Sequence, residues 1–280
     1  MRKLAEKNIS DVVRDLCIEA NIYLRKDVEA ALKKAIKDED KPQAKTLLRQ
    51  LLENAKIAKE EWIALCQDTG MPVVFVDIGT DINFAHMDIV GAINAGIESG
   101  YRHGYLRDSI VLDPLLRRGS SKSTSCIIHF NFSRRKGLKL TVLPKGFGCE
   151  NKTKLMMFNP TVPIEEIKDF IVSVVKEAGP DACPPYILGI GIGGTADYAC
   201  QLSKEALLRP IDKRSNLSHV ARLEEELLKE MNALNIGPIG LGGKTTVLGV
   251  NILTYPTHIA GLPVCVNLSC HVLRSASALL

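Results

Sequence analysis

The sequence predicts a mixed α/β protein, in which a helical N-terminal segment precedes an α/β domain with short strands and glycine-rich loops. Apolar residues recur every three or four positions over residues 10–61, which is the period of amphipathic helices. Beyond Trp62, runs rich in β-branched residues alternate with helical stretches, and Gly and Pro bound them. We therefore expect a helical segment over residues 1–62 and an α/β region over residues 63–280, joined in one continuous domain.

Local signals predict the individual elements. Ser10 and Asp11 suit a helix start, and the charged stretch 37–42 is typical of a turn between helices. The first half of the α/β region then predicts a strand at 71–78, a helix at 87–101, and two strands at 125–132 and 138–143 around a hairpin turn at 134–137. The second half predicts helices at 164–178 and 218–234, and strands at 186–190, 246–253 and 263–268.

The composition excludes several classes of protein. Of the 280 residues, 46% are hydrophobic and 24% are charged, which is the balance of a globular protein and not of a disordered chain. The formal net charge of +4 is too small and too evenly spread to indicate nucleic acid or an anionic membrane as a partner. Charges recur throughout residues 1–30, with no apolar core of a secretory signal, so we expect a cytoplasmic protein.

The stretch 245–273 contains no Asp, Glu, Lys or Arg. It is long enough to span a membrane, but Pro256 and Pro263 interrupt it, and a lipid-exposed helix would not tolerate such breaks. We expect it to form buried protein interior.

Three of the eight cysteines stand in unusual surroundings. Cys66, Cys183 and Cys270 each fall at a turn or at the end of an element, and not on an apolar face. Thiolates on turns, with backbone N–H groups nearby, suit an iron–sulfur cluster because those donors spread its negative charge. The alternative is three unrelated buried thiols, and spacing alone does not exclude it, since the sequence has no C-x2-C motif.

The other five cysteines are weaker candidates. Four of them fall on helix stripes or within strands and are typical of core residues: Cys17, Cys126, Cys200 and Cys265. Cys149 lies in a glycine-rich loop and could be reactive.

Two glycine-rich stretches resemble nucleotide-binding loops, but both depart from the motif. Residues 189–194 have the spacing G-x-G-x-G-G, and no acidic strand end follows about twenty residues later. In residues 237–245 the first glycine of a P-loop is one place off, and a strand follows where a helix is needed. Glycines can also let a backbone approach an inorganic cofactor, or offer N–H groups to an anionic substrate.

Polar residues beside these turns suit a small anion. Four cations each stand next to a turn or a glycine: Arg107, Lys145, Lys244 and Arg274. His258 lies in the uncharged stretch, where a hydrogen-bonded core histidine is the default interpretation.

With these residues in view, the sequence resembles the α-type half of the iron–sulfur hydro-lyases, the family of class I fumarate hydratases and L(+)-tartrate dehydratase. The matching stretches run in order from residue 66 to residue 274: CQDTGMPVVFVDIG, YLRDS, LPKGFGCENKT, ACPPYILGIGIGGTAD, GPIGLGGKTTVLGV and THIAGLPVCVNLSCHVLR.

The resemblance implies a [4Fe–4S] cluster with Cys66, Cys183 and Cys270 as ligands and one open iron. It also implies that Gln67, Asp68 and His258 take part in catalysis. For substrate binding it implies Arg107, with Tyr105 or Arg102 as alternatives, and the backbone of Gly146 and Gly148. Where this sequence has Cys149, the family more often has Ser.

The resemblance further implies an α subunit that works with a separate β-type subunit, which supplies the general base. The leading expectation is reversible hydration of fumarate to (S)-malate, and the close alternative is dehydration of L(+)-tartrate to oxaloacetate. In both cases the substrate is a small dicarboxylate. A non-catalytic scaffold subunit would need none of Gln67, Asp68 and His258, and a nucleotide-binding subunit would need one of the loops set aside above.

Overall fold

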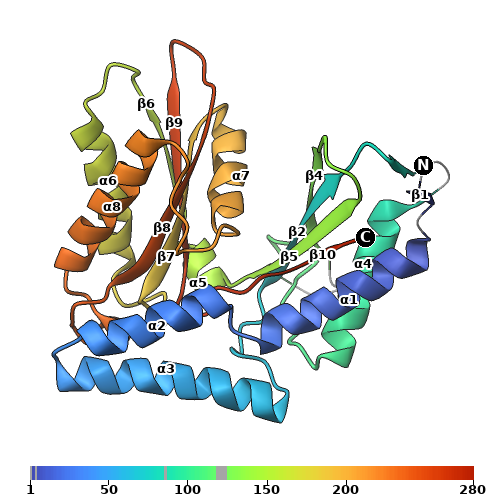
Figure 1. Ribbon diagram of the computed structural model, residues 1–280, viewed down its shortest axis with the longest axis horizontal. Helices are drawn as coiled ribbons and strands as arrows, with labels where there is room; N and C mark the ends of the chain where they lie inside the picture. The colour runs from blue at the N-terminus through green and yellow to red at the C-terminus, as the bar shows by residue number, and fades with distance from the viewer. Residues whose placement is uncertain (1, 4, 85–86, 118–124) are drawn as a thin grey trace. The chain divides into compact units, whose positions relative to one another are not determined.

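The chain divides into two compact units in a computed structural model that describes residues 2–3, 5–84, 87–117 and 125–280 (Figure 1). Unit 1 comprises Met1–Leu24, Ala55–Phe147 and Arg274–Leu280, and unit 2 comprises Arg25–Asn54 and Gly148–Leu273. Both units combine helices with strands, which confirms the predicted α/β class. The predicted organisation into residues 1–62 and 63–280 stays a prediction. Among the described residues, no helix is both long and apolar enough to cross a membrane.

Unit 1 is built on a four-stranded mixed sheet in the order β10-β5-β2-β4. Its strands are β2 (Met71–Ile78), β4 (Ile127–Phe132), β5 (Leu138–Lys145) and β10 (Ala276–Leu279). Strand β2 pairs in parallel with β4 and antiparallel with β5, and β10 pairs antiparallel with β5. A further two-residue pairing joins β1 (Arg2–Lys3) to β3 (Ile82–Asn83).

The predicted hairpin around residues 134–137 is wrong, although both of its strands form. Strand β2 lies between β4 and β5, so the two strands that flank the turn do not pair with each other. The turn instead packs on the end of β2, where Gly79 N donates to Gly137 O (2.9 Å) and Thr80 N donates to Arg135 O (3.1 Å). A non-local parallel pairing has therefore replaced the local one that the turn signal favoured.

Helices α1 (Glu6–Ile22) and α4 (Ile89–His103) cover one face of this sheet and share its apolar core. They approach closely because α4 has a glycine at two points of contact: a Cβ on Gly96 would lie 2.6 Å from Ser10 O, and one on Gly100 would lie 2.8 Å from the Cys17 Cβ. Helix α1 begins at Glu6, so it starts before the predicted Ser10. Asp88 caps α4 by accepting from Gly91 N (2.8 Å).

Unit 2 contains a second four-stranded sheet, in the order β6-β9-β7-β8 (Figure 1). Its strands are β6 (Lys154–Phe158), β7 (Tyr186–Gly193), β8 (Val247–Tyr255) and β9 (Leu262–Ser269). Helices α6 (Ile164–Ala178) and α8 (Ser218–Ala233) pack on one face, and α7 (Ala196–Ala206) packs on the other. All the helices and strands predicted for this half are confirmed, as is the helical position predicted for Cys200, which lies in α7, and β6 adds to them.

Side chains along β7 alternate between the two faces of the sheet, and this alternation explains Gly189 and Gly191. Leu188 and Ile190 enter the core beneath α6 and α8. Gly189 and Gly191 point to the opposite face, where added Cβ atoms would lie 2.0 Å from Ser203 O and 2.1 Å from Ala199 O of α7. These two glycines allow close contact between helix and sheet, so the departure from the dinucleotide motif has a structural reason.

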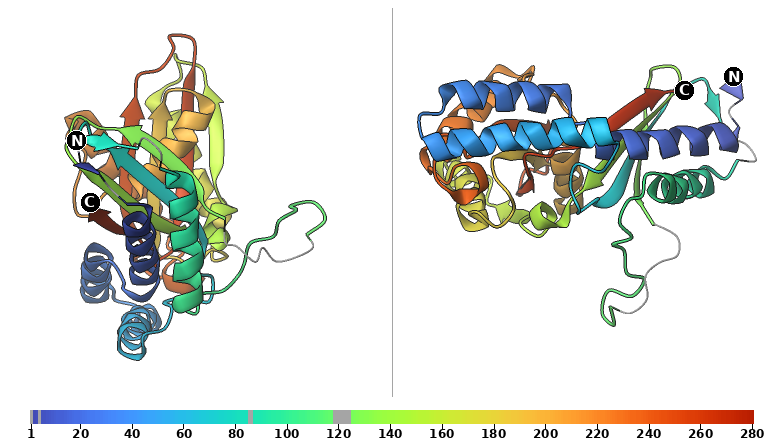
Figure 2. Two further views of the ribbon diagram at one scale, coloured as in Figure 1. Left: turned by 90° about the vertical axis from the view of Figure 1, so that its right-hand side faces the viewer. Right: turned by 90° about the horizontal axis from the view of Figure 1, so that it is seen from below.

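Helices α2 (Lys26–Asp38) and α3 (Pro42–Glu61) run side by side (Figures 1 and 2), and the turn between them falls within the predicted stretch 37–42. The carboxylate of Glu39 in this turn is buried and accepts from Lys41 N (3.0 Å) and Lys244 N (2.8 Å). It thereby fixes the glycine-rich loop that holds the short 3-10 helix η1 (Pro238–Gly240) and leads into β8. Residues 237–245, which resemble a P-loop, are therefore held in place by Glu39. They are followed by β8, as predicted.

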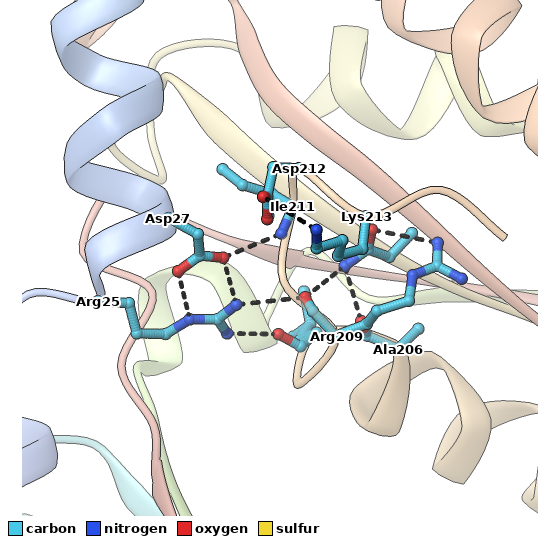
Figure 3. Close-up of polar contacts among 9 residues, drawn as sticks. Arg25, Asp27, Ala206, Arg209, Ile211, Asp212 and Lys213 are labelled. Atoms are coloured by element: carbon cyan, nitrogen blue, oxygen red, sulfur yellow. Dashed lines mark hydrogen bonds and ion pairs between the residues drawn. The ribbon is translucent and has the colours of Figure 1, made fainter.

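A polar network ties the start of α2 to the segment after α7 (Figure 3). The Arg25 guanidinium donates to both carboxylate oxygens of Asp27 (3.0 and 2.6 Å) and to Leu207 O (2.7 Å), and Ile211 N donates to Asp27 (2.9 Å). Burial alone would raise the pKa of the Asp27 carboxyl, but the hydrogen bonds from Arg25 and Ile211 hold that pKa below its ordinary value. Deeper in the unit, buried Glu224 pairs with Arg209.

Candidate active site

The loop at residues 66–70 leads into β2 and carries three of the predicted site residues. Its conformation is fixed by Asp68, whose carboxylate accepts from Gly70 N (3.0 Å) and from Phe147 N (2.8 Å). The second bond joins the loop to the glycine turn after β5. Cys66 and Asp68 are half-buried and Gln67 is exposed, so the loop presents side chains to solvent while its backbone is held.

Thr69 and Tyr101 anchor the next part of the loop. The Thr69 hydroxyl donates to Arg107 O and accepts from Arg107 N, both at 3.1 Å. The Tyr101 hydroxyl donates to Thr69 O (3.0 Å) and Gly70 O (2.6 Å), and burial raises the pKa of Tyr101, so the phenol keeps its proton. The segment 105–108 is thereby attached to the predicted site loop.

Arg107, Arg102 and Tyr105 are the three predicted candidates for binding a carboxylate, and their surroundings differ. Arg107 is exposed and its backbone is joined to the loop. Arg102 instead pairs with Glu98 (2.8 Å) on the surface of α4, and the Tyr105 side chain is almost fully exposed.

Arg274 is buried beneath the same loop. Its Nη2 donates to Asp68 O (2.8 Å), its Nη1 donates to Asn21 Oδ1 (3.1 Å), and its Nε has no hydrogen-bond partner among the described residues. Asn21 O also accepts from Leu65 N (2.8 Å). The guanidinium therefore stabilises the backbone of the loop at 66–70. This structural role differs from the anion-binding role that its position beside a turn suggested.

The glycine turn after β5 approaches the loop from the other side. Gly70 has φ +76°, and a Cβ there would lie 2.9 Å from the backbone of Lys145. A Cβ on Gly146 would lie 3.3 Å from Asp68 Oδ2, whereas one on Gly148 would meet no described atom within 4 Å. Lys145 is buried and its ammonium donates to Gly146 O (3.4 Å).

In unit 2, the structure brings two of the three predicted cluster-binding segments together. Cys183 is exposed in a turn with φ +60°, and Cys270 directly follows β9 and is half-buried. His271 Nδ1 lies 3.2 Å from Cys183 O. Cys149 contacts the same turn, because its buried thiol donates to Ala182 O (3.2 Å).

His258 lies in the exposed loop between β8 and β9, so the default interpretation as a core histidine is wrong. The loop turns back at Gly261, whose N donates to His258 O (3.1 Å). His258 Nδ1 accepts from Ala260 N (3.1 Å), which leaves Nε2 as the protonated nitrogen of the neutral ring. The prediction that the whole stretch 245–273 is interior holds for residues 246–253 and for β9 but not for residues 254–260.

Exposure separates only some of the remaining cysteines from the three predicted ligands. Cys17 and Cys265 are buried, as predicted for core residues, while Cys126 and Cys200 are half-buried. Burial raises the pKa of the thiols of Cys17 (to about 12), Cys126 (to about 11) and Cys265. A raised pKa disfavours the thiolate that metal binding needs.

All eight cysteines are thiols and form no disulfide. In the part of the chain that the structure describes, no group of three or more His, Cys, Asp or Glu side chains is close enough to hold a metal ion. Cys66 belongs to unit 1, and Cys183 and Cys270 belong to unit 2. The joint role of the three cysteines stays a prediction, although accessible thiols on turns are the donors that an iron–sulfur cluster requires.

Comparison with known proteins gives the chain a class and a family. A model of the fumarate hydratase (Fumerase) family matches residues 10–279. The chain is 42% identical over 274 residues to a putative L(+)-tartrate dehydratase subunit alpha of Methanocaldococcus jannaschii, covering 96% of both chains. It is also 30% identical to a putative fumarate hydratase class I of Geobacillus stearothermophilus, of which it spans 48%, and 26% identical to L(+)-tartrate dehydratase subunit alpha of Escherichia coli, of which it spans 92%.

These matches, on an α/β fold with the site loop described above, define the chain as a hydro-lyase, an enzyme that removes water from its substrate or adds it. More particularly, the chain belongs to the fumarate hydratase family.

Proposed function

We propose that this chain is the α subunit of a [4Fe–4S]-dependent hydro-lyase that, together with a β-type subunit, reversibly hydrates fumarate to (S)-malate. The observation that carries the proposal is the fixed geometry of the loop 66–70, in which Asp68 is held by Gly70 N and Phe147 N directly beside Cys66 and Gln67. A scaffold subunit would have no need of this arrangement. The relatives named alpha subunits match the chain over nearly its whole length, which supports a separate partner subunit.

Cys66, Cys183 and Cys270 would hold the cluster, and their accessible positions on turns suit that role. When bound, the cluster would supply a Lewis-acidic iron that makes hydroxide a better leaving group. The remaining steps fall to residues of this chain and its partner.

Asp68 and Gln67 would orient the substrate at the reacting carbon. Because both Asp68 oxygens accept backbone hydrogen bonds, this carboxylate has one fixed direction and needs little reorganisation during the reaction. The Arg107 guanidinium would bind one carboxylate of the substrate through paired hydrogen bonds. The backbone N–H groups of Gly146 and Gly148 would receive the other carboxylate.

His258 would approach the bound substrate with Nε2, which carries the proton when Nδ1 accepts from Ala260 N. A hydrogen-bond donor there suits an oxygen of the substrate. The general base would come from the β-type subunit.

L(+)-tartrate is the second candidate substrate, and a specific observation favours it. The relative at 42% identity is named as a putative tartrate dehydratase subunit, and the fumarate hydratase relative is more distant at 30%. The same residues would bind either acid, since both are four-carbon dicarboxylates.

The test is an assay of the α chain purified with its β-type partner and reconstituted anaerobically with iron and sulfide. We expect turnover of fumarate and of (S)-malate, with no turnover by either subunit alone. Turnover of L(+)-tartrate without turnover of malate would assign the second candidate. No turnover of either acid by a complex that carries a full cluster would contradict the proposal.

A further inference from the structure

A pocket of about 570 Å³ lies within unit 1, beside the turn that joins β4 to β5. Its volume falls in the range of roughly 300–1,000 Å³ that small-molecule sites occupy. Its lining comes from the turn, from Asp77 of β2, from Lys139 of β5, and from the residues of β10. None of the residues assigned to the reaction above contributes to it.

Most of the charged side chains that line this pocket are positive. Arg135, Lys136 and Lys139 line it, against the single carboxylate of Asp77. Asp77 lies 4.0 Å from the Lys139 ammonium, which is a long contact between half-exposed groups. No carboxylate among the described residues pairs with Arg135 or Lys136. An excess of unpaired cations at a concave surface favours a ligand with several negative charges.

The turn that carries Arg135 and Lys136 is held in place by hydrogen bonds of its backbone. Gly79 N and Thr80 N donate to the carbonyls of Gly137 and Arg135, and Gly137 N donates to Asp81 Oδ1 (2.7 Å). A Cβ on Gly79 would lie 2.5 Å from both of those carbonyl oxygens, so only glycine permits this approach. The backbone that carries Arg135 and Lys136 is therefore set before any ligand arrives, so only their exposed side chains must become ordered on binding.

Part of the pocket lining is apolar. Ala278 and Leu279 of β10 contribute to the lining, and the Leu279 side chain is largely exposed although it is apolar. Leu279 is the cross-strand neighbour of Lys139, so an apolar and a basic side chain of the lining are adjacent on the sheet.

From this arrangement we infer that the pocket is a binding site for an organic polyanion, namely a nucleoside polyphosphate. The phosphate chain lies against Arg135, Lys136 and Lys139, and the uncharged nucleoside covers Leu279. The hydroxyl groups of half-buried Ser133 and exposed Ser277 add hydrogen-bond partners at the wall. This inference does not depend on the proposed function, because the pocket shares no residue with the candidate active site.

Isothermal titration calorimetry on the full chain, with EDTA present to remove Mg²⁺, tests the inference with three probes. We expect ATP to bind most tightly, pyrophosphate to bind less tightly, and adenosine not to bind measurably. Binding of ATP should weaken as salt concentration rises. If neither ATP nor pyrophosphate binds, the inference is overturned.

Charge-reversal variants locate the site. The double variant Arg135→Glu/Lys136→Glu should lose about tenfold or more in ATP affinity, since charge-assisted hydrogen bonds are lost. Arg134→Glu is the matched control: it makes the same kind of change in the same exposed turn, but Arg134 does not line the pocket. Leu279→Ser should reduce the affinity for ATP while leaving that for pyrophosphate unchanged.

Two outcomes would assign binding elsewhere and overturn the inference. Equal losses per reversed charge at Arg134 and at Arg135 and Lys136 would mean a diffuse electrostatic attraction. ATP binding that appears only in a second titration, with Mg²⁺ in place of EDTA, and that disappears in Lys244→Ala but survives in Arg135→Glu/Lys136→Glu, would point to the glycine-rich loop at 237–245. Thermal unfolding of each variant without ligand is the control for folding: we expect the midpoints to be close to that of the wild type, because the substituted turn is exposed.

Discussion

Arg274 Nη2 donates a hydrogen bond of 2.8 Å to the backbone carbonyl of Asp68, and Nη1 of the same guanidinium reaches Asn21 on α1. One buried cation thus joins the end of the first helix, the loop at 66–70 and the segment before the last strand. Few residues in unit 1 connect segments so distant in sequence.

We expect Arg274→Lys to lower catalytic turnover and stability, because an ammonium cannot span both acceptors as the planar guanidinium does. Each lost charge-assisted hydrogen bond should lower the free energy of unfolding by about 1.5–3 kcal/mol. Asn21→Ala removes the contact of Arg274 with α1 and the bond from Asn21 Nδ2 to Cys17 O but keeps the bond to Asp68 O, so it should lower stability with a smaller effect on kcat. Urea unfolding and steady-state kinetics of the two variants measure these effects. If both variants reduce kcat equally, Arg274 has no particular link to the loop.

The glycine turn gives a second pair of variants. Gly148→Ala should leave the unfolding midpoint unchanged, because no described atom lies within 4 Å of the added Cβ, but it should raise KM if the substrate uses that space. Gly146→Ala should lower kcat as well, because its Cβ would lie 3.3 Å from Asp68 Oδ2 and displace that carboxylate. Unchanged kinetics in Gly148→Ala would remove Gly148 from the substrate site.

The cysteines can be sorted by iron content. After anaerobic reconstitution, we expect Cys66→Ser, Cys183→Ser and Cys270→Ser to lose most of the bound iron and the visible absorbance of the cluster. Cys200→Ser is the matched control and should retain both, because Cys200 lies within α7 and away from the turns. Equal losses in Cys200→Ser and Cys270→Ser would contradict the assignment of ligands.

Asp27 makes the stability of unit 2 depend on acidity. Its pKa in the folded chain lies below the ordinary value of 3.8, so the carboxylate stabilises the fold at and above that pH. This contribution should be lost as the pH falls below about 4 through the folded pKa. Urea unfolding of the wild type and of Asp27→Asn between neutral pH and pH ~3 measures the difference. We expect the variant to be less stable at neutral pH and the two curves to converge in acid; a constant difference would rule out this contribution.

Local patterns were sufficient for most of the secondary structure. Apolar residues that recur every three or four positions predicted the helices of residues 10–61 and also α6 and α8, because each of these helices has a continuous apolar stripe. The hairpin between 125–132 and 138–143 was wrong because a two-residue period does not identify the partner strand, and β2 intervenes. Strand β10 was missed since Ser275 and Ser277 interrupt a short apolar run.

For the candidate site, sequence identified the residues on turns better than those that support them. The loop 66–70 and the glycines after β5 are visible as local motifs. Asn21 and Tyr101 were missed because their partners lie far away in the sequence. Asn21 did carry a signal, as a polar residue four positions after Cys17 on the buried stripe of α1; its Nδ2 donates to Cys17 O (2.9 Å).

The threading of the chain through its two units has a consequence for synthesis. Unit 1 takes α1 from an early segment and Arg274 and β10 from a late one, so its sheet lacks an edge strand, and its site loop lacks a buried cation, until residues 274–279 have been synthesised and have left the ribosome. Unit 2 draws its second segment from residues 148–273 and can close earlier. We therefore expect a released fragment that ends at residue 273 to contain a protected unit 2 and an incomplete, protease-sensitive unit 1.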